Sequence, residues 1–247
     1  MDRMIYLAMS GAKQILAQQE VVAHNLANAS TTGFRAQLSA LRAVPVQGPG
    51  AATRTYVVET TPGASFAPGP VEQTGRELDV AVLGSGWIAV QSPDGAEAYT
   101  RDGRLQVSAN GVLTTGGGHP VMGDGGPITV PPDAKLTIAP DGTVSGLQPG
   151  QNASNVVPLG RIKLVNPPEA DIVRGDDGLF RLKNGGAAPA DAAVRLAPGA
   201  LEGSNVNVVE AMVTMIGLAR QFDLQMRLLS NAEANAREAA RLLSPAR

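Results

Sequence analysis

Apolar residues recur at alternating spacings of three and four positions near the amino terminus. The pattern runs through Met4–Leu26, with polar Gln19 as its one interruption. Such spacing places the apolar side chains on one narrow stripe of a helix. A stripe with a period near 3.5 is typical of a coiled-coil seam, which needs a partner helix. The stripe residues are Ile5, Ala8, Ala12, Ile15, Val22 and Leu26.

The same spacing returns near the carboxyl terminus. Asn207 followed three residues later by Glu210 is a capping-box arrangement that predicts where this second helix begins. We therefore predict two long terminal helices that pair as a coiled coil. The alternative is two ordinary amphipathic helices packed on the central part of the chain. The second stripe comprises Met212, Met215, Ala219, Phe222, Met226, Leu229, Ala236, Ala240 and Leu243, broken by Glu233.

The chain between the predicted helices begins with a segment rich in proline and glycine. Repeated Pro and Gly from Val44 to Pro70 exclude a continuous helix, and Tyr56–Val58 is the only strand-like run. We interpret residues 43–75 as an extended connector. An edge hairpin is the alternative interpretation.

From Glu77 onward, short β-prone runs alternate with Asp-Gly or Asn-Gly pairs, which accept the positive φ angles of tight hairpin turns. This alternation predicts antiparallel hairpins rather than βαβ units. The pairs begin at Asp94, Asp102, Asn110, Asp124, Asp141, Asp177 and Asn184. The predicted strands are Leu78–Leu83, Trp87–Gln91, Glu97–Thr100, Leu105–Val107, Val112–Thr115, Leu159–Val165, Leu179–Lys183 and Val194–Leu196.

The predicted fold class is therefore α+β, with a central all-β antiparallel domain between the paired terminal helices. We expect an N-terminal helix and loop over residues 1–42 and the connector over 43–75. The β domain would span 76–203, and the C-terminal helix 204–247.

Composition excludes several classes of function. The 247 residues carry a net charge of −2, so no electrostatic footprint for nucleic acid is present. There is no cysteine, which excludes disulfides and thiolate metal sites. No apolar run approaches the roughly 18 residues that a membrane span needs, so no membrane insertion is expected. Asp2, Lys13 and Glu20 argue against a cleavable signal peptide.

Short patterns typical of catalytic, nucleotide-binding or metal-binding sites occur in this sequence, but they are weak evidence for such sites. Gly84-Ser85-Gly86 follows a strand like a dinucleotide fingerprint, but a second strand rather than a helix is predicted after it. Ser10 and Lys13 match the S-x-x-K pattern of acyl-transferring enzymes, which arises often by chance. His24 and His119 are isolated, which makes a poor case for a metal. We predict no catalytic, cofactor or metal site.

Several motifs together resemble the bacterial flagellar axial proteins, the rod and hook family. Within the family, Met1–Tyr6 and Ala8–Ala12 are most similar to a proximal rod protein, and a distal rod protein is the near rival. The motifs cover nearly the whole chain. They are Asn25–Asn28, Thr31–Phe34, Glu77–Val82, Tyr99–Gly103, Asn110–Leu113 and Ser204–Met212.

The resemblance implies a structural subunit without catalysis, exported by the flagellar type III apparatus without a cleavable signal and assembled in the periplasmic rod. It implies that the terminal helices line the inner tube and contact proximal and distal rod subunits or further copies. The expected assembly interface is the stripe residues of the first helix with Met212, Met215, Ala219, Phe222, Met226 and Leu229. The alternatives are a hook-type axial protein, a cell-wall-active secreted enzyme, and an adhesin with a coiled-coil stalk.

Overall fold

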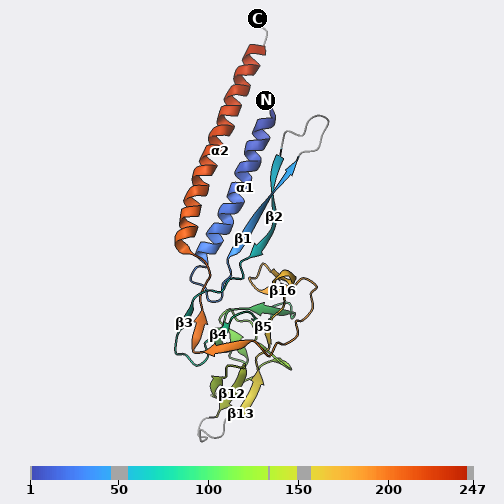
Figure 1. Cartoon of the computed structure of the whole chain (residues 1–247), viewed down its shortest axis with the longest axis vertical. Coiled ribbons are helices and arrows are strands. Elements are labelled where there is room, and N and C mark those ends of the chain that lie inside the picture. Colours follow the sequence, from blue (N-terminus) through green and yellow to red (C-terminus); the bar gives the residue numbers. More distant parts are fainter. Residues whose placement is uncertain (1, 46–54, 133, 149–156, 244–247) are drawn as a thin grey trace. The chain divides into compact units, whose positions relative to one another are not determined.

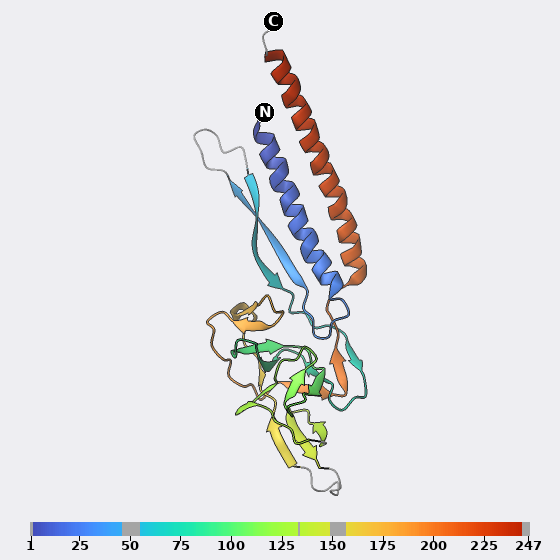
Figure 2. The same ribbon diagram turned by 180° about the vertical axis from the view of Figure 1, so that it is seen from behind.

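A computed structural model describes residues 2–45, 55–132, 134–148 and 157–243. The chain divides into two compact units, each shown in Figures 1 and 2. The helical unit contains Met1–Asn28, Gln37–Gly63 and Val206–Arg247. The β unit contains Ala29–Ala36 and Ala64–Asn205.

The helical unit is built from α1 (Asp2–Ala27), α2 (Val208–Leu243) and the two-stranded sheet of β1 (Gln37–Pro45) and β2 (Thr55–Ala64). The two helices lie side by side and run in opposite directions in both views (Figures 1 and 2). Strand β1 packs along α1.

Two asparagines organise the ends of these helices. Near the end of α1, the Asn25 side chain donates to the Gln37 carbonyl oxygen (2.9 Å) and accepts from the Gln37 N–H (2.8 Å). This pair of bonds joins α1 to the start of β1. At the start of α2, Asn207 Oδ1 accepts from the N–H groups of Val209 (3.1 Å) and Glu210 (3.2 Å). The predicted cap at Asn207 is therefore confirmed.

The β unit consists of short antiparallel strands and one 3₁₀ turn, η1 (Glu169–Asp171). Its largest sheet has the strand order β14-β5-β6-β16-β15, and a second sheet has the order β11-β12-β13. Four strand pairs complete the unit: β4 with β17, β3 with β18, β7 with β8, and β9 with β10. The bounds are β3 Val71–Gln73, β4 Val80–Leu83, β5 Trp87–Gln91, β6 Glu97–Thr100, β7 Leu105–Val107, β8 Leu113–Thr115, β9 Met122–Gly123, β10 Gly126–Pro127, β11 Lys135–Ile138, β12 Thr143–Leu147, β13 Val157–Arg161, β14 Leu164–Val165, β15 Ile172–Arg174, β16 Phe180–Leu182, β17 Arg195–Pro198 and β18 Ala200–Glu202.

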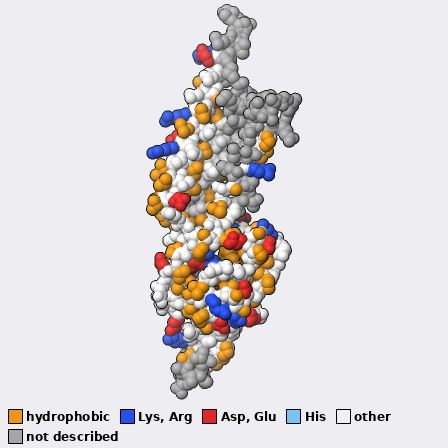
Figure 3. All heavy atoms as spheres, in the orientation of Figure 1, with side chains coloured by type: hydrophobic (Ala, Val, Ile, Leu, Met, Phe, Trp, Pro, Cys, Tyr) orange, Lys and Arg blue, Asp and Glu red, His pale blue; other side chains and the backbone are white. Residues whose placement is uncertain are grey.

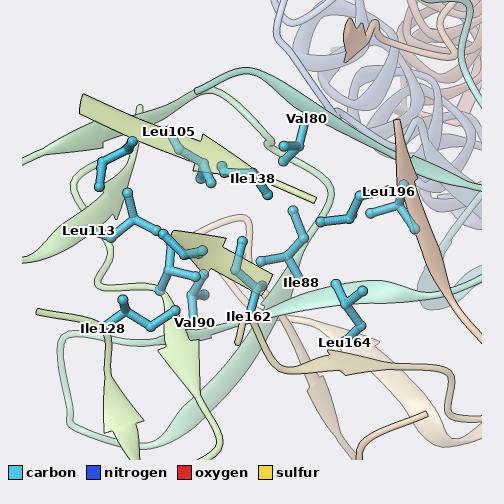
Figure 4. Close-up of a cluster of buried hydrophobic side chains, with 14 of the residues drawn as sticks. Val80, Ile88, Val90, Leu105, Leu113, Ile128, Ile138, Ile162, Leu164 and Leu196 are labelled. Atoms are coloured by element: carbon cyan, nitrogen blue, oxygen red, sulfur yellow. The ribbon is translucent and has the colours of Figure 1, made fainter. Parts of the chain in front are cut away.

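Strand β5 is apolar because both faces of its sheet are covered. Ile88 and Val90 belong to the large core cluster, which Figure 4 shows with side chains from several strands converging on it. Trp87 and Ala89 alternate with them and belong to a second cluster on the other face, with Tyr99. A strand buried on both faces carries consecutive apolar residues instead of an alternating pattern. Strand β5 therefore lies between the two cores.

The α+β class and the antiparallel β region are confirmed. Strands lie within or overlap every predicted β run, and β5, β6 and β7 have the predicted bounds. The predicted run at Leu159–Val165 is divided between β13 and β14.

The expected connector at 43–75 differs from the structure. It contains all of β2 and β3, which pair with β1 and β18, so much of the segment is paired strand. Proline and glycine are tolerated in such edge strands because one side of the strand makes no ladder bonds. Residues 46–54 of the predicted connector lie outside the described residues.

The Asp102-Gly103 pair is not the hairpin turn that the sequence predicts. Gly103 does not have a positive φ, whereas the glycines following Asp94, Asn110 and Asp141 do. Glycine is needed for a different reason, since a Cβ at this position would lie 1.6 Å from the Val80 carbonyl oxygen. The two backbones also bond here, with the Val80 N–H donating to the Gly103 oxygen (3.0 Å). A close backbone contact therefore replaces a turn.

Among the described residues, neither helix combines the length and the apolar character of a membrane-spanning segment.

Gly103→Ala tests this backbone contact. The added Cβ would overlap the Val80 carbonyl, which is fixed in β4, so we expect thermal unfolding to show a loss of about 3 kcal/mol or more in the β unit. Gly125→Ala is the matched control, since its Cβ would meet no atom within 4 Å. It should change stability by less than about 1 kcal/mol. Equal melting of the two variants would contradict the contact.

Candidate assembly interface

The α1 stripe residues face the interior of the helical unit. Ile15 is buried, and the other predicted members are half-buried: Ile5, Ala8, Ala12, Val22 and Leu26. A second stripe of α1 faces solvent and carries the apolar residues Tyr6, Met9 and Leu16. The helix is thus apolar on more than one side.

The predicted α2 residues separate into two groups. Met215, Phe222 and Leu229 are half-buried, whereas Met212, Ala219 and Met226 are exposed. Leu218, which the sequence analysis did not select, is the most buried residue of α2 at 8% exposure. The residues turned inward repeat at spacings of four and three: Ala211, Met215, Leu218, Phe222, Gln225, Leu229 and Ala232.

Two features of the sequence explain why the inward stripe of α2 was not predicted correctly. Gln225 is polar but occupies an inward position, where its side chain packs against Gly11 of α1. Met226, next to it, is apolar but exposed. The predicted stripe took the apolar residue at each step. Its members Met215, Phe222 and Leu229 therefore face inward, whereas its members between them lie on the exposed side of α2. The 3,4 period itself could have identified Ala211 and Leu218 as alternatives.

The opposite face of α2 exposes a contiguous apolar surface on its first turns. Val209, Met212, Val213 and Ile216 are each 50% to 71% exposed. At 100° per residue, these four lie on the side of the helix opposite Ala211 and Leu218. We call this set the outer face of α2. In Figure 3, hydrophobic side chains gather along this helix.

In the β unit, a buried ion network joins segments that are distant in sequence. Glu202 accepts hydrogen bonds from Arg35 Nη2 (2.6 Å, to Oε1) and from Arg101 Nη1 (2.9 Å, to Oε2). All three residues are 4% exposed or less. The Gly69 N–H also donates to Glu202 Oε1 (3.0 Å). The carboxylate thus holds together β18, the 29–36 segment and the end of β6.

Arg101 also connects this network to β4 and to the loop that follows it. Its guanidinium donates to the carbonyl oxygens of Val82 (3.2 Å) and Gly84 (2.7 Å). Burial lowers the pKa of Arg101, and the Glu202 carboxylate opposes that shift. An arginine guanidinium carries its positive charge throughout the pH range in which proteins are folded. Two positive charges therefore share one negative charge.

Backbone bonds surround the network. The Gly33 N–H donates to the Glu202 carbonyl oxygen (2.7 Å). Asn205 Oδ1 accepts from the Ala36 N–H (2.7 Å), and its Nδ2 donates to the carbonyl oxygens of Ser65 (3.0 Å) and Ala67 (2.9 Å). Gly33 has φ +68°, and a Cβ there would lie 2.2 Å from the Arg101 carbonyl carbon. These contacts fix residues 33–36 beside residues 202–205.

Three of the sequence motifs therefore meet at one place. Thr31–Phe34 lies directly before Arg35, Tyr99–Gly103 contains Arg101, and Ser204–Met212 contains Asn205 and follows Glu202. We call the network Arg35–Glu202–Arg101 with Gly33 and Asn205 the junction. Sequence patterns alone did not identify it, because its ion pairs join residues up to 167 positions apart.

The patterns that suggested chemistry lie in two different parts of the chain. Ser10 and Lys13 are both in α1. Strand β5 follows the Gly84–Gly86 loop as predicted, and Arg101 of the junction donates to the Gly84 carbonyl oxygen. Within the residues that the structure describes, no three His, Cys, Asp or Glu side chains are grouped to hold a metal ion.

Three family models match the chain. They are described as flagella basal body rod protein (residues 5–35), flagellar hook protein FlgE/F/G D1 domain (residues 81–146) and flagellar basal body rod FlgEFG protein C-terminal (residues 197–242). The first and third cover the helices and their junction segments, and the second covers the β unit from β4 to β12.

Curated relatives match over nearly the full length. The flagellar basal-body rod protein FlgF of Escherichia coli strain K12 is 53% identical over 250 residues, covering 99% of each chain. The FlgF protein of Salmonella typhimurium strain LT2 has the same identity and coverage. The flagellar basal-body rod protein FlgG of Buchnera aphidicola (Acyrthosiphon pisum) is 29% identical, covering 93% of this chain and 95% of its own.

Glu202→Gln tests the junction. The neutral amide would leave two buried guanidiniums without a counter-charge, so we expect the β unit to lose about 3–5 kcal/mol, measured by urea unfolding. Glu72→Gln on exposed β3 is the matched control and should change stability by less than about 0.5 kcal/mol. If both variants unfold at the same urea concentration as the native chain, the junction does not hold the unit together.

Proposed function

This chain belongs to the FlgF family of flagellar basal-body rod proteins and is a structural subunit of the rod, and we propose that it polymerises through its terminal helices in the proximal rod. The family is structural and is not a family of enzymes. Rod proteins of this family assemble with other rod and hook proteins. We infer that the direct neighbours are further copies and the adjoining proximal and distal rod subunits.

The observation that carries this proposal is the outer face of α2. Monomeric proteins rarely leave a contiguous apolar surface uncovered, because covering it removes an unfavourable contact with water. Val209, Val213 and Ile216 point away from α1, so pairing of the two helices within one chain cannot bury them. A neighbouring subunit would bury them.

The predicted interface residues would act in two ways. Met212, Ala219 and Met226 are exposed and would contact a neighbouring subunit directly. The inward residues Met215, Phe222 and Leu229, with the α1 stripe, would hold α1 and α2 together as a coiled coil. This pairing would keep the outer face correctly presented.

A helix that contacts its own chain on one side and a neighbour on the other is suited to polymerisation. Contacts between different faces of successive subunits generate a helical array when the rotation from one subunit to the next does not close into a ring. In such an array the helices would form the shaft that transmits torque. We propose that the subunits reach the rod through the flagellar type III export apparatus, without cleavage of a signal peptide.

Ile216→Asp tests the outer face. The side chain is solvent-exposed in the single chain, so the variant should keep its helical circular dichroism and unfold within about 0.5 kcal/mol of the native chain. In the rod, an unpaired carboxylate would be buried at a cost of several kcal/mol. We therefore expect cells carrying only this variant to be non-motile, as scored on soft agar.

Two matched variants complete this experiment. Gln221→Asp adds the same charge at another exposed position of α2, away from the outer face, and should leave motility intact. Leu218→Asp places the charge against α1, so it should reduce the helical signal of the isolated chain itself. Normal swimming with Ile216→Asp would show that the outer face is not an assembly surface.

A further inference from the structure

A pocket of about 430 Å³ opens in the β unit beside the junction. Its wall includes the Gly84-Ser85-Gly86 loop, Trp87, Phe66 and Arg101. Asn166 and the exposed Glu169 also line it. The pocket lies wholly within the β unit, and its ligand chemistry is independent of the rod function proposed above.

Charge is unbalanced behind this pocket. Arg35 and Arg101 together carry two positive charges against the single carboxylate of Glu202, and all three are buried. Three of their N–H groups have no hydrogen-bond acceptor: Nε and Nη1 of Arg35 and Nε of Arg101. Uncompensated buried charge acts over a longer range than a surface charge, because little water screens it. The buried network behind the pocket therefore carries a net positive charge.

The glycine loop lines the pocket and carries backbone N–H groups, which are neutral donors. Gly84 and Gly86 have φ +70° and +129°, which turn successive peptide groups of the loop in directions that L side chains rarely allow. Among the described residues, the N–H groups of Ser85 and Gly86 donate to no backbone carbonyl outside the strands. The Ser85 side chain is exposed at the same place. A carboxylate is a strong acceptor for backbone N–H groups of this kind.

Aromatic rings form another part of the wall. The Phe66 ring meets the Trp87 ring edge-on, with centroids 6.0 Å apart. The Arg101 guanidinium carbon lies 5.4 Å from the centroid of the Trp87 ring. An apolar wall beside a positive charge suits a ligand that has an apolar body and one negative charge. Exposed Glu169 at the rim disfavours a dianion such as phosphate.

We propose that this pocket binds a carboxylate attached to an apolar group, with the anion at the Gly84–Gly86 loop and the apolar part against Phe66 and Trp87. The ligand would be either a small free carboxylate or an acidic side chain of another protein that lies next to an aromatic residue. Both share the same recognition chemistry.

Trp87 provides a direct measurement, since it is the only tryptophan in the chain. Titration of the full chain with benzoate, with excitation of the indole only, should give a saturable change in Trp87 fluorescence. Benzamide has the same shape without the charge and should bind at least tenfold more weakly. The absence of a saturable benzoate signal, or equal binding of benzamide, would overturn the proposal.

Ser85→Asp places a competing carboxylate at the exposed mouth of the pocket and should weaken benzoate binding at least tenfold. Ser145→Asp, on the outward side of β12, is the matched control and should bind as the native chain does. Thermal unfolding of both variants shows whether the fold is kept. Native-like benzoate binding by folded Ser85→Asp would overturn the assignment of the anion to this loop.

A last experiment distinguishes a small free carboxylate from an acidic side chain of another protein as the ligand. The blocked dipeptide acetyl-Phe-Asp-amide presents a carboxylate beside an aromatic ring, as a protein segment would. Saturable binding of this probe together with benzoate supports an acidic segment of another protein as the ligand. Binding of benzoate without the dipeptide supports a small free carboxylate.

Discussion

The β unit depends on one buried carboxylate. Glu202 is the only acidic group between Arg35 and Arg101 in the described junction, and it accepts from both guanidiniums and from the Gly69 N–H. Desolvation of three charged groups offsets much of their attraction, so the network adds little net stability. Its contribution is geometric, because each guanidinium donates to a different oxygen of the same carboxylate and both bonds must form at once. The network therefore selects one relative placement of three distant segments.

Sequence patterns predicted the parts of the fold that depend on local periodicity. Local propensity and turn chemistry act within a few residues, so they can be recognised in the sequence. They identified the terminal helices, the Asn207 cap and the short strands from Val80 onward. Strand β3 and most of β2 were interpreted as connector because proline and glycine dominate their surroundings, although the strand-like run Tyr56–Val58 lies in β2 and the alternative of an edge hairpin fits its pairing with β1. Their pairing with β1 and β18 is set by tertiary contacts that no local pattern shows.

The candidate sites were less predictable, for two different physical reasons. On α2, apolar residues occur on both sides of the helix, so hydrophobicity alone cannot tell the side that meets α1 from the outer face. Gln225 and Met226 show this directly, since the polar residue faces inward and the apolar one faces out. At the junction, Arg35, Arg101 and Glu202 look like ordinary charged residues in the sequence. Only folding brings them together and removes water from them.

The Gly33–Glu202 hydrogen bond has a consequence for how such chains diversify. The chain first enters the β unit at residues 29–36, returns to the helical unit over residues 37–63, and finally leaves the β unit at residues 199–205. The first entry and the last exit are bonded to each other. A longer β11–β12 hairpin, which contains no junction residue, leaves the spacing of these crossings unchanged. The strands of the β unit that carry no junction residue thus behave as an exchangeable cassette that can be enlarged or remodelled without altering the segments that lead to α1 and α2.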